Sequence, residues 1–316
     1  MKAALVYKAG GPDVFVIEDR PIPKLKTGWS VIKVLGFGIN HSEIFTRQGL
    51  SPSVTFPRIL GIECVGEVVE TQAPHLKPGQ RIISIMGEMG RAFDGSYAEY
   101  TLLPDEQIYP VKTELPLEKL VALPETYYTA YGAFKNLQIK AGDTTLIRGA
   151  ASGVGLAMLD LIKAQFPQNE VFGSSRHLEK RKTLQKCGYD GIILDKDNVL
   201  QTDLTFDKIL ELVGPSSIKD SFNHIKEKGV ICSNGQLGGR WFLEDFDPIM
   251  DLKNNSYLTS FYSGNVSLKK LQEMLDYVAA FQVPVHVEKI FKLDEITEAH
   301  AYIESKESFG KIIVLT

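Results

Sequence analysis

Cysteine is scarce in this sequence: the 316 residues include 3, at the scattered positions Cys64, Cys187 and Cys232. An odd, scattered set provides no disulfide framework and is typical of proteins from a reducing compartment. The sequence also lacks an uninterrupted apolar stretch of membrane-spanning length, and its first apolar run is too short for a signal peptide. We therefore expect a cytoplasmic protein with no membrane association.

Net charge is low as well, because 35 Lys and Arg residues face 39 Asp and Glu residues, giving a formal charge of -4. With this balance the whole molecule has no basic field that would recruit nucleic acid, so no nucleic-acid partner is expected. One local basic cluster spans Arg176 and Lys180 to Lys182. Its simplest interpretation is the solvated face of a helix. A hydrophobic content of 44% with 23% charged residues indicates a globular protein, and the length allows two domains.

Metal ligands at characteristic spacing are absent too. The six histidines, at positions 41, 75, 177, 224, 286 and 300, show no ligand spacing. The triplet His41-Ser-Glu43 is interpreted as a surface or loop segment. No metal site is therefore expected.

The most informative segment runs from Asp143 to Gln165. A short β-prone run, Thr144 to Arg148, precedes a small-residue turn, Gly149-Ala-Ala-Ser-Gly-Val-Gly155, and an apolar segment of helical length. Such a turn brings backbone N–H groups at a helix N-terminus close to a pyrophosphate. The strict G-x-G-x-x-G pattern is not met, since only Gly155 falls in register, so a buried turn of small residues remains an alternative. The expected dinucleotide contacts are Ala151, Ser152, Gly153, Val154 and Gly155.

The end of the next strand predicts which dinucleotide binds. Where an NAD site would place an acid, this strand ends in Ser174-Ser175-Arg176, with Lys180 one helical turn later. Two bases and two hydroxyls suit a ribose 2′-phosphate, so we expect NADPH. Asp195, expected just after the third strand, would weaken that site.

Short Val- and Ile-rich strands and turn signals dominate the first hundred residues, whereas helices and strands alternate from about Leu120. The fold class is therefore α/β, with a small β-rich barrel or sandwich followed by a doubly wound parallel sheet. The later expected elements are strands 171–175, 192–194, 206–213, 229–233 and 257–262, and helices 126–137, 178–186 and 216–225. Val213-Gly214 and Asn234-Gly235 end strands on the ligand-binding side of such a sheet. The tail, with strands 286–291 and 311–315 around helix 294–304, could return to the first domain.

Several short motifs follow one another along the chain, and their order and spacing resemble those of the medium-chain dehydrogenase/reductase superfamily. Within this superfamily, the chain resembles the zinc-free quinone oxidoreductase branch. The motifs are Gly38-Ile-Asn40, Gly61-Ile-Glu63, Gly79-Gln-Arg81, Gly95-Ser-Tyr-Ala-Glu99, Thr129-Ala-Tyr131 and the nucleotide turn. The resemblance implies a GroES-like catalytic domain of residues 1–122 and 263–316 and a Rossmann domain of residues 123–262. It also implies NADPH held between the domains and a homodimer joined through the nucleotide-binding domain, with strand 257–262 as the natural joint.

Zinc-binding relatives resemble this chain but carry cysteine where Asn40 stands and Gly-His-Glu where Gly61-Ile62-Glu63 stands. Ile62 cannot ligate a metal and Asn40 is a poor zinc ligand. Thr129 and Lys311 match family positions near the cofactor. Each also has a simpler interpretation, as a packed helix residue and a solvated strand residue respectively.

Without zinc, the residues that touch the substrate would orient it and stabilise charge. Asn40 is the candidate donor to a developing enolate oxygen, although an asparagine that satisfies groups within a turn is equally consistent with the sequence. Several quinone reductases that resemble this chain have tyrosine where Phe45 stands. Phe45 can pack against a flat substrate but cannot donate a proton, so the substrate and the proton source both stay open, with solvent as a candidate proton source.

The leading functional hypothesis is an NADPH-dependent reductase of quinones or α,β-unsaturated carbonyls. A second hypothesis keeps the cofactor but takes an enoyl thioester as substrate. A third is a nucleotide-binding redox sensor with little turnover that acts through a protein or RNA partner. The missing tyrosine at Phe45 favours the third slightly, whereas the nucleotide turn and Asn40 favour catalysis.

Overall fold

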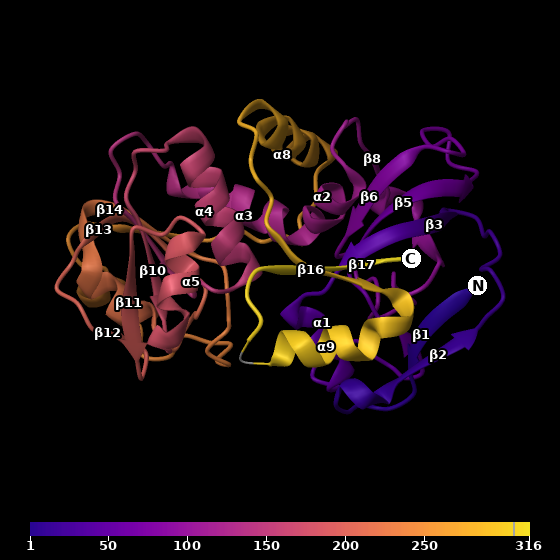
Figure 1. Cartoon of the computed structure of the whole chain (residues 1–316), viewed down its shortest axis with the longest axis horizontal. Coiled ribbons are helices and arrows are strands. Elements are labelled where there is room, and N and C mark those ends of the chain that lie inside the picture. Colours follow the sequence, from indigo (N-terminus) through magenta and orange to yellow (C-terminus); the bar gives the residue numbers. More distant parts are fainter. Residues whose placement is uncertain (306) are drawn as a thin grey trace. The chain divides into compact units, whose positions relative to one another are not determined.

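A computed structural model describes residues 1–305 and 307–316 and divides into two compact units (Figure 1). Unit 1 contains Met1–Tyr128, Ser263–Ala279 and Val287–Thr316. Unit 2 contains Thr129–Tyr262 and Ala280–His286. In this division residues 123–128 belong to unit 1 and residues 280–286 to unit 2.

Unit 1 is built on two sheets. One is a 3-stranded sheet in the order β2-β1-β4, and the other is 7-stranded, in the order β16-β17-β3-β5-β6-β8 with β7 paired to β3. The strands are β1 (Lys2–Val6), β2 (Phe15–Asp19), β3 (Trp29–Gly38), β4 (Arg58–Ile59), β5 (Glu63–Glu70), β6 (Arg81–Ile85), β7 (Tyr100–Pro104), β8 (Tyr109–Pro110), β16 (Val287–Lys292) and β17 (Lys311–Leu315). The α-helices are α1 (His41–Arg47), α2 (Leu117–Ala122), the start of α3 (Pro124–Leu137), α8 (Leu268–Ala280) and α9 (Ile296–Glu304).

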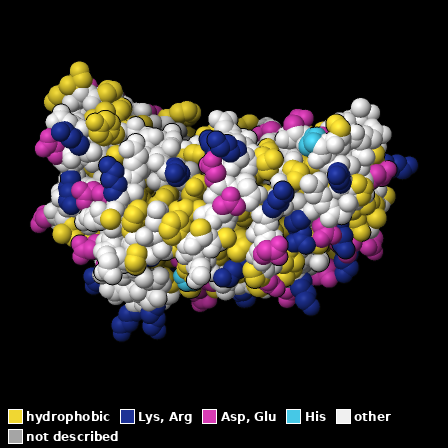
Figure 2. Space-filling view, turned by 90° about the horizontal axis from the view of Figure 1, so that it is seen from above, with side chains coloured by type: hydrophobic (Ala, Val, Ile, Leu, Met, Phe, Trp, Pro, Cys, Tyr) yellow, Lys and Arg dark blue, Asp and Glu magenta, His cyan; other side chains and the backbone are white. Residues whose placement is uncertain are grey.

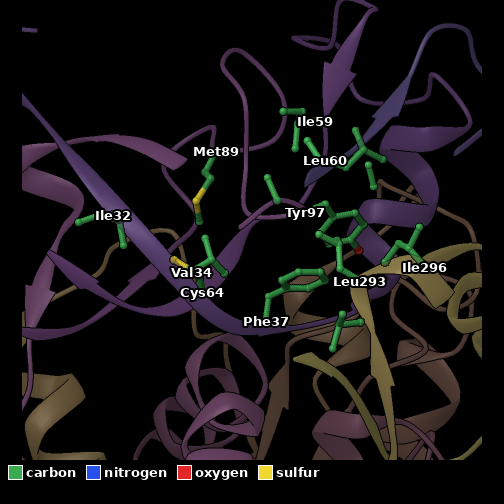
Figure 3. Packing of buried hydrophobic residues seen from close by; sticks show 14 of the residues in the cluster. Ile32, Val34, Phe37, Ile59, Leu60, Cys64, Met89, Tyr97, Leu293 and Ile296 are labelled. Carbon is green, nitrogen blue, oxygen red and sulfur yellow. The ribbon is translucent and has the colours of Figure 1, made fainter. Parts of the chain in front are cut away.

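The core of unit 1 joins the two ends of the chain (Figure 3). Phe37 and Tyr97 stack with ring centroids 4.5 Å apart, and Leu293 and Ile296 from the C-terminal segment belong to the same cluster. Strand β17 pairs antiparallel with β3, which places the last strand inside the N-terminal sheet. The expected return of the tail to the first domain is therefore confirmed.

Unit 2 contains the doubly wound parallel sheet that the sequence predicts. The strand order is β12-β11-β10-β9-β13-β14-β15, and only the short β12 runs antiparallel to its neighbour. The chain builds outwards from β9 in one direction and then from β13 in the other, so the topological switch point lies between β9 and β13. The strands are β9 (Thr145–Arg148), β10 (Val171–Ser175), β11 (Gly191–Lys196), β12 (Val199–Leu200), β13 (Phe206–Glu211), β14 (Ile225–Ser233) and β15 (Tyr257–Thr259), and the α-helices are the rest of α3, α4 (Gly153–Gln165), α5 (Arg181–Lys186), α6 (Ile218–Ser221) and α7 (Pro248–Asp251).

Several expected elements of unit 2 are wrong in length: strand 206–213 ends at Glu211, and strand 229–233 begins at Ile225. The helix predicted over 216–225 is only α6 followed by a short 3-10 turn, because Ile225 already pairs with Phe206 as the first residue of β14. The strand predicted over 257–262 ends at Thr259. Side-chain amides of Asn136 and Asn234 donate to the backbone carbonyls of residues 260 and 261, which gives these groups partners outside the sheet ladder.

The expected helix 178–186 begins instead with a 3-10 turn at Leu178–Lys180, and α5 starts at Arg181. The β-prone segment from Gly95 to Leu103 is strand only from Tyr100. Its first part bonds to the segment around β4 instead, since the N–H groups of Gly95 and Tyr97 donate to the carbonyls of Ile59 and Leu60.

No helix within residues 1–305 and 307–316 combines the length and apolarity that a bilayer span requires. On the face shown in Figure 2, basic and acidic side chains are interspersed.

Candidate functional site

The small-residue turn connects β9 to α4 in unit 2. Gly149 has a φ of +95°, a left-handed conformation that favours glycine, and Ser152 is the N-cap of α4. The Ser152 hydroxyl accepts from the Gly155 N–H at 3.1 Å and donates to the Gly149 carbonyl at 2.8 Å. A Cβ on Gly155 would lie 2.8 Å from the Gly149 oxygen, so only glycine allows this close approach.

This geometry suits an anion, because the first N–H groups of an α-helix have no acceptor within the helix and the helix dipole favours negative charge there. Ala151, Ser152, Gly153 and Val154 are half-buried around the turn, and Gly155 is buried behind it. The residues present therefore fit a dinucleotide pyrophosphate.

The loops after β13 and β14 lie beside this turn at the carboxyl ends of the parallel strands. A Cβ on Gly149 would meet Leu212 at 3.2 Å, and one on Gly214 would meet the Gly235 carbonyl at 2.4 Å. The structure thus brings Val213-Gly214 and Asn234-Gly235 together, as expected. The Asn234 side chain is engaged internally, since its amide donates to the Phe261 carbonyl at 2.9 Å.

The two serines at the end of β10 differ from expectation. Ser174 is 2% exposed, and its hydroxyl accepts from the Gly149 N–H at 3.3 Å and donates to Asp195 at 3.4 Å. The Ser175 hydroxyl donates to the His177 carbonyl at 2.9 Å. Both hydroxyls therefore hold the protein's own loops, which does not support their assignment as phosphate donors.

The two bases are placed more favourably. Arg176 is exposed directly after β10, and Lys180 is half-buried at the end of the 3-10 turn. Arg181 and Lys182 are exposed, as the solvated-face interpretation of the cluster expects.

The expected position of Asp195, just after the third strand, is wrong. This residue lies within β11 rather than after it, is 5% exposed, and pairs with the Arg148 guanidinium at 2.7 and 3.0 Å. Its charge is therefore compensated inside the unit. The sequence reasoning missed Arg148 and Glu211, although a charged residue at the end of each apolar strand signals that these side chains need buried partners.

Unit 1 holds the second group of expected site residues, around Asn40. Its side-chain amide donates to Glu63 at 2.9 Å and to Glu43 at 3.4 Å, and its oxygen accepts from the Lys311 ammonium at 2.8 Å. Lys311 also donates to Glu63 at 2.6 Å. A Cβ on Gly38 would lie 2.2 Å from the Lys311 side chain, so this glycine makes room for the lysine. We call Asn40, Glu43, Glu63 and Lys311 the buried acid cluster.

Lys311 is 2% exposed, so the interpretation of a solvated strand lysine is wrong. The interpretation of His41-Ser-Glu43 as a surface or loop triplet is right only for His41, which is exposed. The triplet forms the first turn of α1, and Glu43 is fully buried. Burial and the nearby Glu63 charge raise the pKa of Glu43 to about 8, while Lys311 opposes this shift.

Phe45 is half-buried in α1, and Thr129 is buried in α3 at the start of unit 2. Their expected roles stay predictions. Because the Asn40 amide already has internal partners, its role as a donor to substrate also stays a prediction.

Asn40 and Ile62 stand at the positions where the resemblance implies zinc ligands in zinc-binding relatives, and Ile62 is 2% exposed. In the described part of the chain, which leaves out residue 306, no three His, Cys, Asp or Glu side chains are grouped so that they could hold a metal ion.

The chain resembles known proteins over its whole length. A family model described as alcohol dehydrogenase GroES-like domain matches residues 26–113, and one described as zinc-binding dehydrogenase matches residues 188–314. Quinone oxidoreductase of Pongo abelii is 27% identical, with 100% of this chain and 98% of the relative covered.

Solved structures agree on the fold. The quinone oxidoreductase from Coxiella burnetii has a TM-score of 0.83 at 24% identity, covering 100% of this chain and 99% of that one. A mycobacterial protein solved in complex with NADPH has a TM-score of 0.82 at 21% identity, with both chains covered at 100%.

These similarities confirm the expected fold class, a GroES-like β-rich domain with a Rossmann domain. The chain belongs to the medium-chain dehydrogenase/reductase superfamily, in its quinone oxidoreductase-like branch.

Proposed function

We propose that this protein is an oxidoreductase of the quinone reductase type that uses NADPH, works without zinc and reduces quinones or α,β-unsaturated carbonyls. The observation that carries the proposal is the turn from Gly149 to Gly155, which offers helix N–H groups at the switch point of a doubly wound sheet. NADPH, when bound, supplies the hydride. The relatives named quinone oxidoreductase support the substrate class.

The residues of the chain itself would then bind the nucleotide and orient it. The turn residues Ala151 to Gly155 would hold the pyrophosphate, and the loops at Val213-Gly214 and Asn234-Gly235 would border it. Arg176 and Lys180 would face the 2′-phosphate, because both bases directly follow the second strand of the sheet. The one acid between them, Glu179, is exposed and lies 3.9 Å from His177. Asp195 does not oppose this proposal, since Arg148 pairs with it.

In the catalytic unit, Asn40 would donate to the developing enolate oxygen. Of its two amide contacts, the one to Glu43 is longer, at 3.4 Å, and is therefore the one more easily exchanged for a substrate oxygen. Phe45 would pack against a flat substrate, and solvent would supply the proton.

The cofactor proposal is tested with dissociation constants for NADPH and NADH in wild type, Arg176→Ala and Lys180→Ala, with Lys182→Ala as the exposed control. A charge-assisted hydrogen bond contributes roughly 1.5–3 kcal/mol, so losing either base should reduce the NADPH preference about tenfold or more. Equal binding of both nucleotides by the wild type would refute the preference.

The substrate proposal is tested by NADPH oxidation with a panel of quinones, enones, enals and enoyl thioesters. Turnover with quinones or enones supports the proposal. Turnover with thioesters alone would assign the second substrate class, and tight NADPH binding without turnover would indicate a sensor.

We further propose that the protein forms a homodimer joined at β15. We also propose that it is a cytoplasmic protein. Strand β15 ends the sheet of unit 2, and Tyr257 and nearby Tyr262 are 58% and 66% exposed. An unpaired sheet edge with exposed aromatic side chains suits pairing with a second copy.

A further inference from the structure

Arg148 is fully buried at the end of β9, directly before the nucleotide turn. Each of its five N–H groups has an acceptor. Nε and Nη2 donate to the two Asp195 oxygens at 2.7 and 3.0 Å, and Nη2 also donates to the Asn198 carbonyl at 2.7 Å. Nη1 donates to the Ser217 carbonyl and the Ser221 hydroxyl, each at 2.9 Å. A guanidinium with this set of partners is held in one orientation.

The partners of Arg148 hold the segments that border the nucleotide turn. On one side, Asp195 accepts from the Ser174 hydroxyl, which in turn accepts from the N–H of Gly149. A continuous path of hydrogen bonds therefore runs from the guanidinium to the first residue of the turn.

On the other side, Glu211 lies 3.9 Å from Arg148 and shares the Ser221 hydroxyl with it. One Glu211 oxygen accepts from the N–H groups of Val213 and Gly214 at 2.8 and 3.0 Å. The Glu211 carboxylate therefore holds the loop after β13, and Arg148 is the cation that lies next to this carboxylate. Arg148 and Glu211 are also register partners across the switch point between β9 and β13.

The charges of this group are unequal. Arg148 faces three carboxylates, because Asp220 also lies 3.0 Å from Nη1, and no more than 15% of any of these side chains is exposed. Burial raises the pKa of Glu211, with Arg148 the main opposing influence. Without the arginine, Asp195 and Glu211 would lose the cation with which each of them is paired at the edge that receives the nucleotide. The resulting negative field opposes NADPH more than NADH, because the 2′-phosphate adds nearly two negative charges.

We propose that Arg148 is a positioning and specificity residue, which fixes the shape of the nucleotide-binding edge and offsets part of the negative charge of its buried acids, so that the edge accepts a 2′-phosphorylated nucleotide. The specificity half rests on the function proposed above, whereas the positioning half concerns the nucleotide-free protein.

The test compares Arg148→Lys and Arg148→Met with Arg47→Lys. Arg47 is the matched control because it is also fully buried and is bidentate to Glu304 at 2.8 and 2.7 Å, but within unit 1. Two quantities are measured: amide hydrogen exchange without nucleotide, and the ratio of NADPH to NADH dissociation constants. The double variant Arg148→Met with Asp195→Asn is added to separate charge from shape.

Both Arg148 variants should speed exchange in peptides covering residues 149–155 and 211–215 by about three- to tenfold, the effect of losing one ordinary hydrogen bond. Arg47→Lys should leave these peptides unchanged. Arg148→Met should reduce the NADPH preference by about tenfold, Arg148→Lys should keep most of it because the charge remains, and the double variant should recover part of it.

Exchange that rises equally in all variants, or not at all in these two segments, would overturn the positioning role. An NADPH preference unchanged in Arg148→Met would overturn the specificity role. If Arg148→Met does not fold, hydrogen exchange in Arg148→Lys still tests the positioning role. The specificity role is then tested by the NADPH preference of Arg148→Lys, which should be kept, and of Arg148→Ala. In Arg148→Ala the preference should be lost without added guanidinium and regained when guanidinium is present. A wild type that binds neither nucleotide would refute the proposed function, while the exchange comparison would still decide whether Arg148 shapes the edge.

Discussion

Replacing Glu43 with glutamine should change how stability depends on pH. Glu43 is fully buried, and burial together with the Glu63 charge raises its pKa from 4.5 to about 8. The folded protein therefore binds this proton more tightly than the unfolded chain does. The contribution stabilises the fold fully below pH 4.5 and is lost as the pH rises to about 8.

The size of the effect follows from these two pKa values. Linkage predicts that this group alone lowers the free energy of unfolding by about 3–4 kcal/mol between pH 5 and pH 8. Glutamine is uncharged at every pH, so Glu43→Gln should lack this part of the slope. It should also carry a constant penalty of about 1 kcal/mol, since its side-chain NH2 cannot accept from the Asn40 N–H, which Glu43 accepts at 3.2 Å.

The assay is urea unfolding of wild type and Glu43→Gln at half-unit steps from pH 5 to pH 9. The difference between the two curves removes the contributions of all other groups. The expected result is a variant about as stable as wild type at pH 5 and about 3 kcal/mol more stable than wild type at pH 8. Parallel curves would refute the reasoning, because they would mean that Glu43 ionises with an ordinary pKa.

His300 should make stability depend on pH in the acid range, because burial and the Arg47 charge lower its pKa to about 3. Its contribution to the free energy of unfolding is complete above pH 6.5 and is lost on acidification, at up to about 1.4 kcal/mol per pH unit. The difference in acid unfolding between wild type and His300→Gln should show this slope. Asn40→Ala should lower turnover about 10²–10³-fold with an unchanged NADPH dissociation constant, as loss of an oxyanion donor does, and unchanged steady-state kinetics in a folded variant would make Asn40 structural. Dialysis against a chelator should leave the melting temperature and NADPH oxidation unchanged, whereas stoichiometric zinc by elemental analysis would contradict the zinc-free assignment. Light scattering at micromolar concentration should give a dimer, and a strict monomer would rule out the β15 joint.

The sequence predicts the nucleotide-binding unit well where the signals are local. The run from Thr144 to Gln165 contains strand, turn and helix in order, and their periodicity and small residues lie within a few residues of each other. The return of the tail was predictable from the family resemblance. Helix 216–225 was predicted too long, because pairing of Ile225 with Phe206 is a tertiary contact that overrides local propensity.

The buried acid cluster could not be predicted in the same way. Glu63 and Lys311 are 248 residues apart in sequence, and no local pattern shows that a lysine in the last strand reaches a glutamate in β5. Arg148 was visible as a charge ending an apolar strand, but its partners come from β11, α6 and β13. A sequence shows that such a charge needs a partner without showing which one it has.

The pairing of β17 with β3 has a consequence for the order in which the protein is made. Glu63 is synthesised early, but Lys311, the cation that it pairs with, follows 248 residues later, after unit 2. Nearly all of unit 2 is contiguous and is translated before β17, so it can fold as soon as it emerges. Unit 1 cannot complete its sheet until β17 emerges, and until then buried Glu63 has no Lys311 to pair with. During synthesis, residues 1–128 therefore depend on protection from aggregation until β17 has emerged.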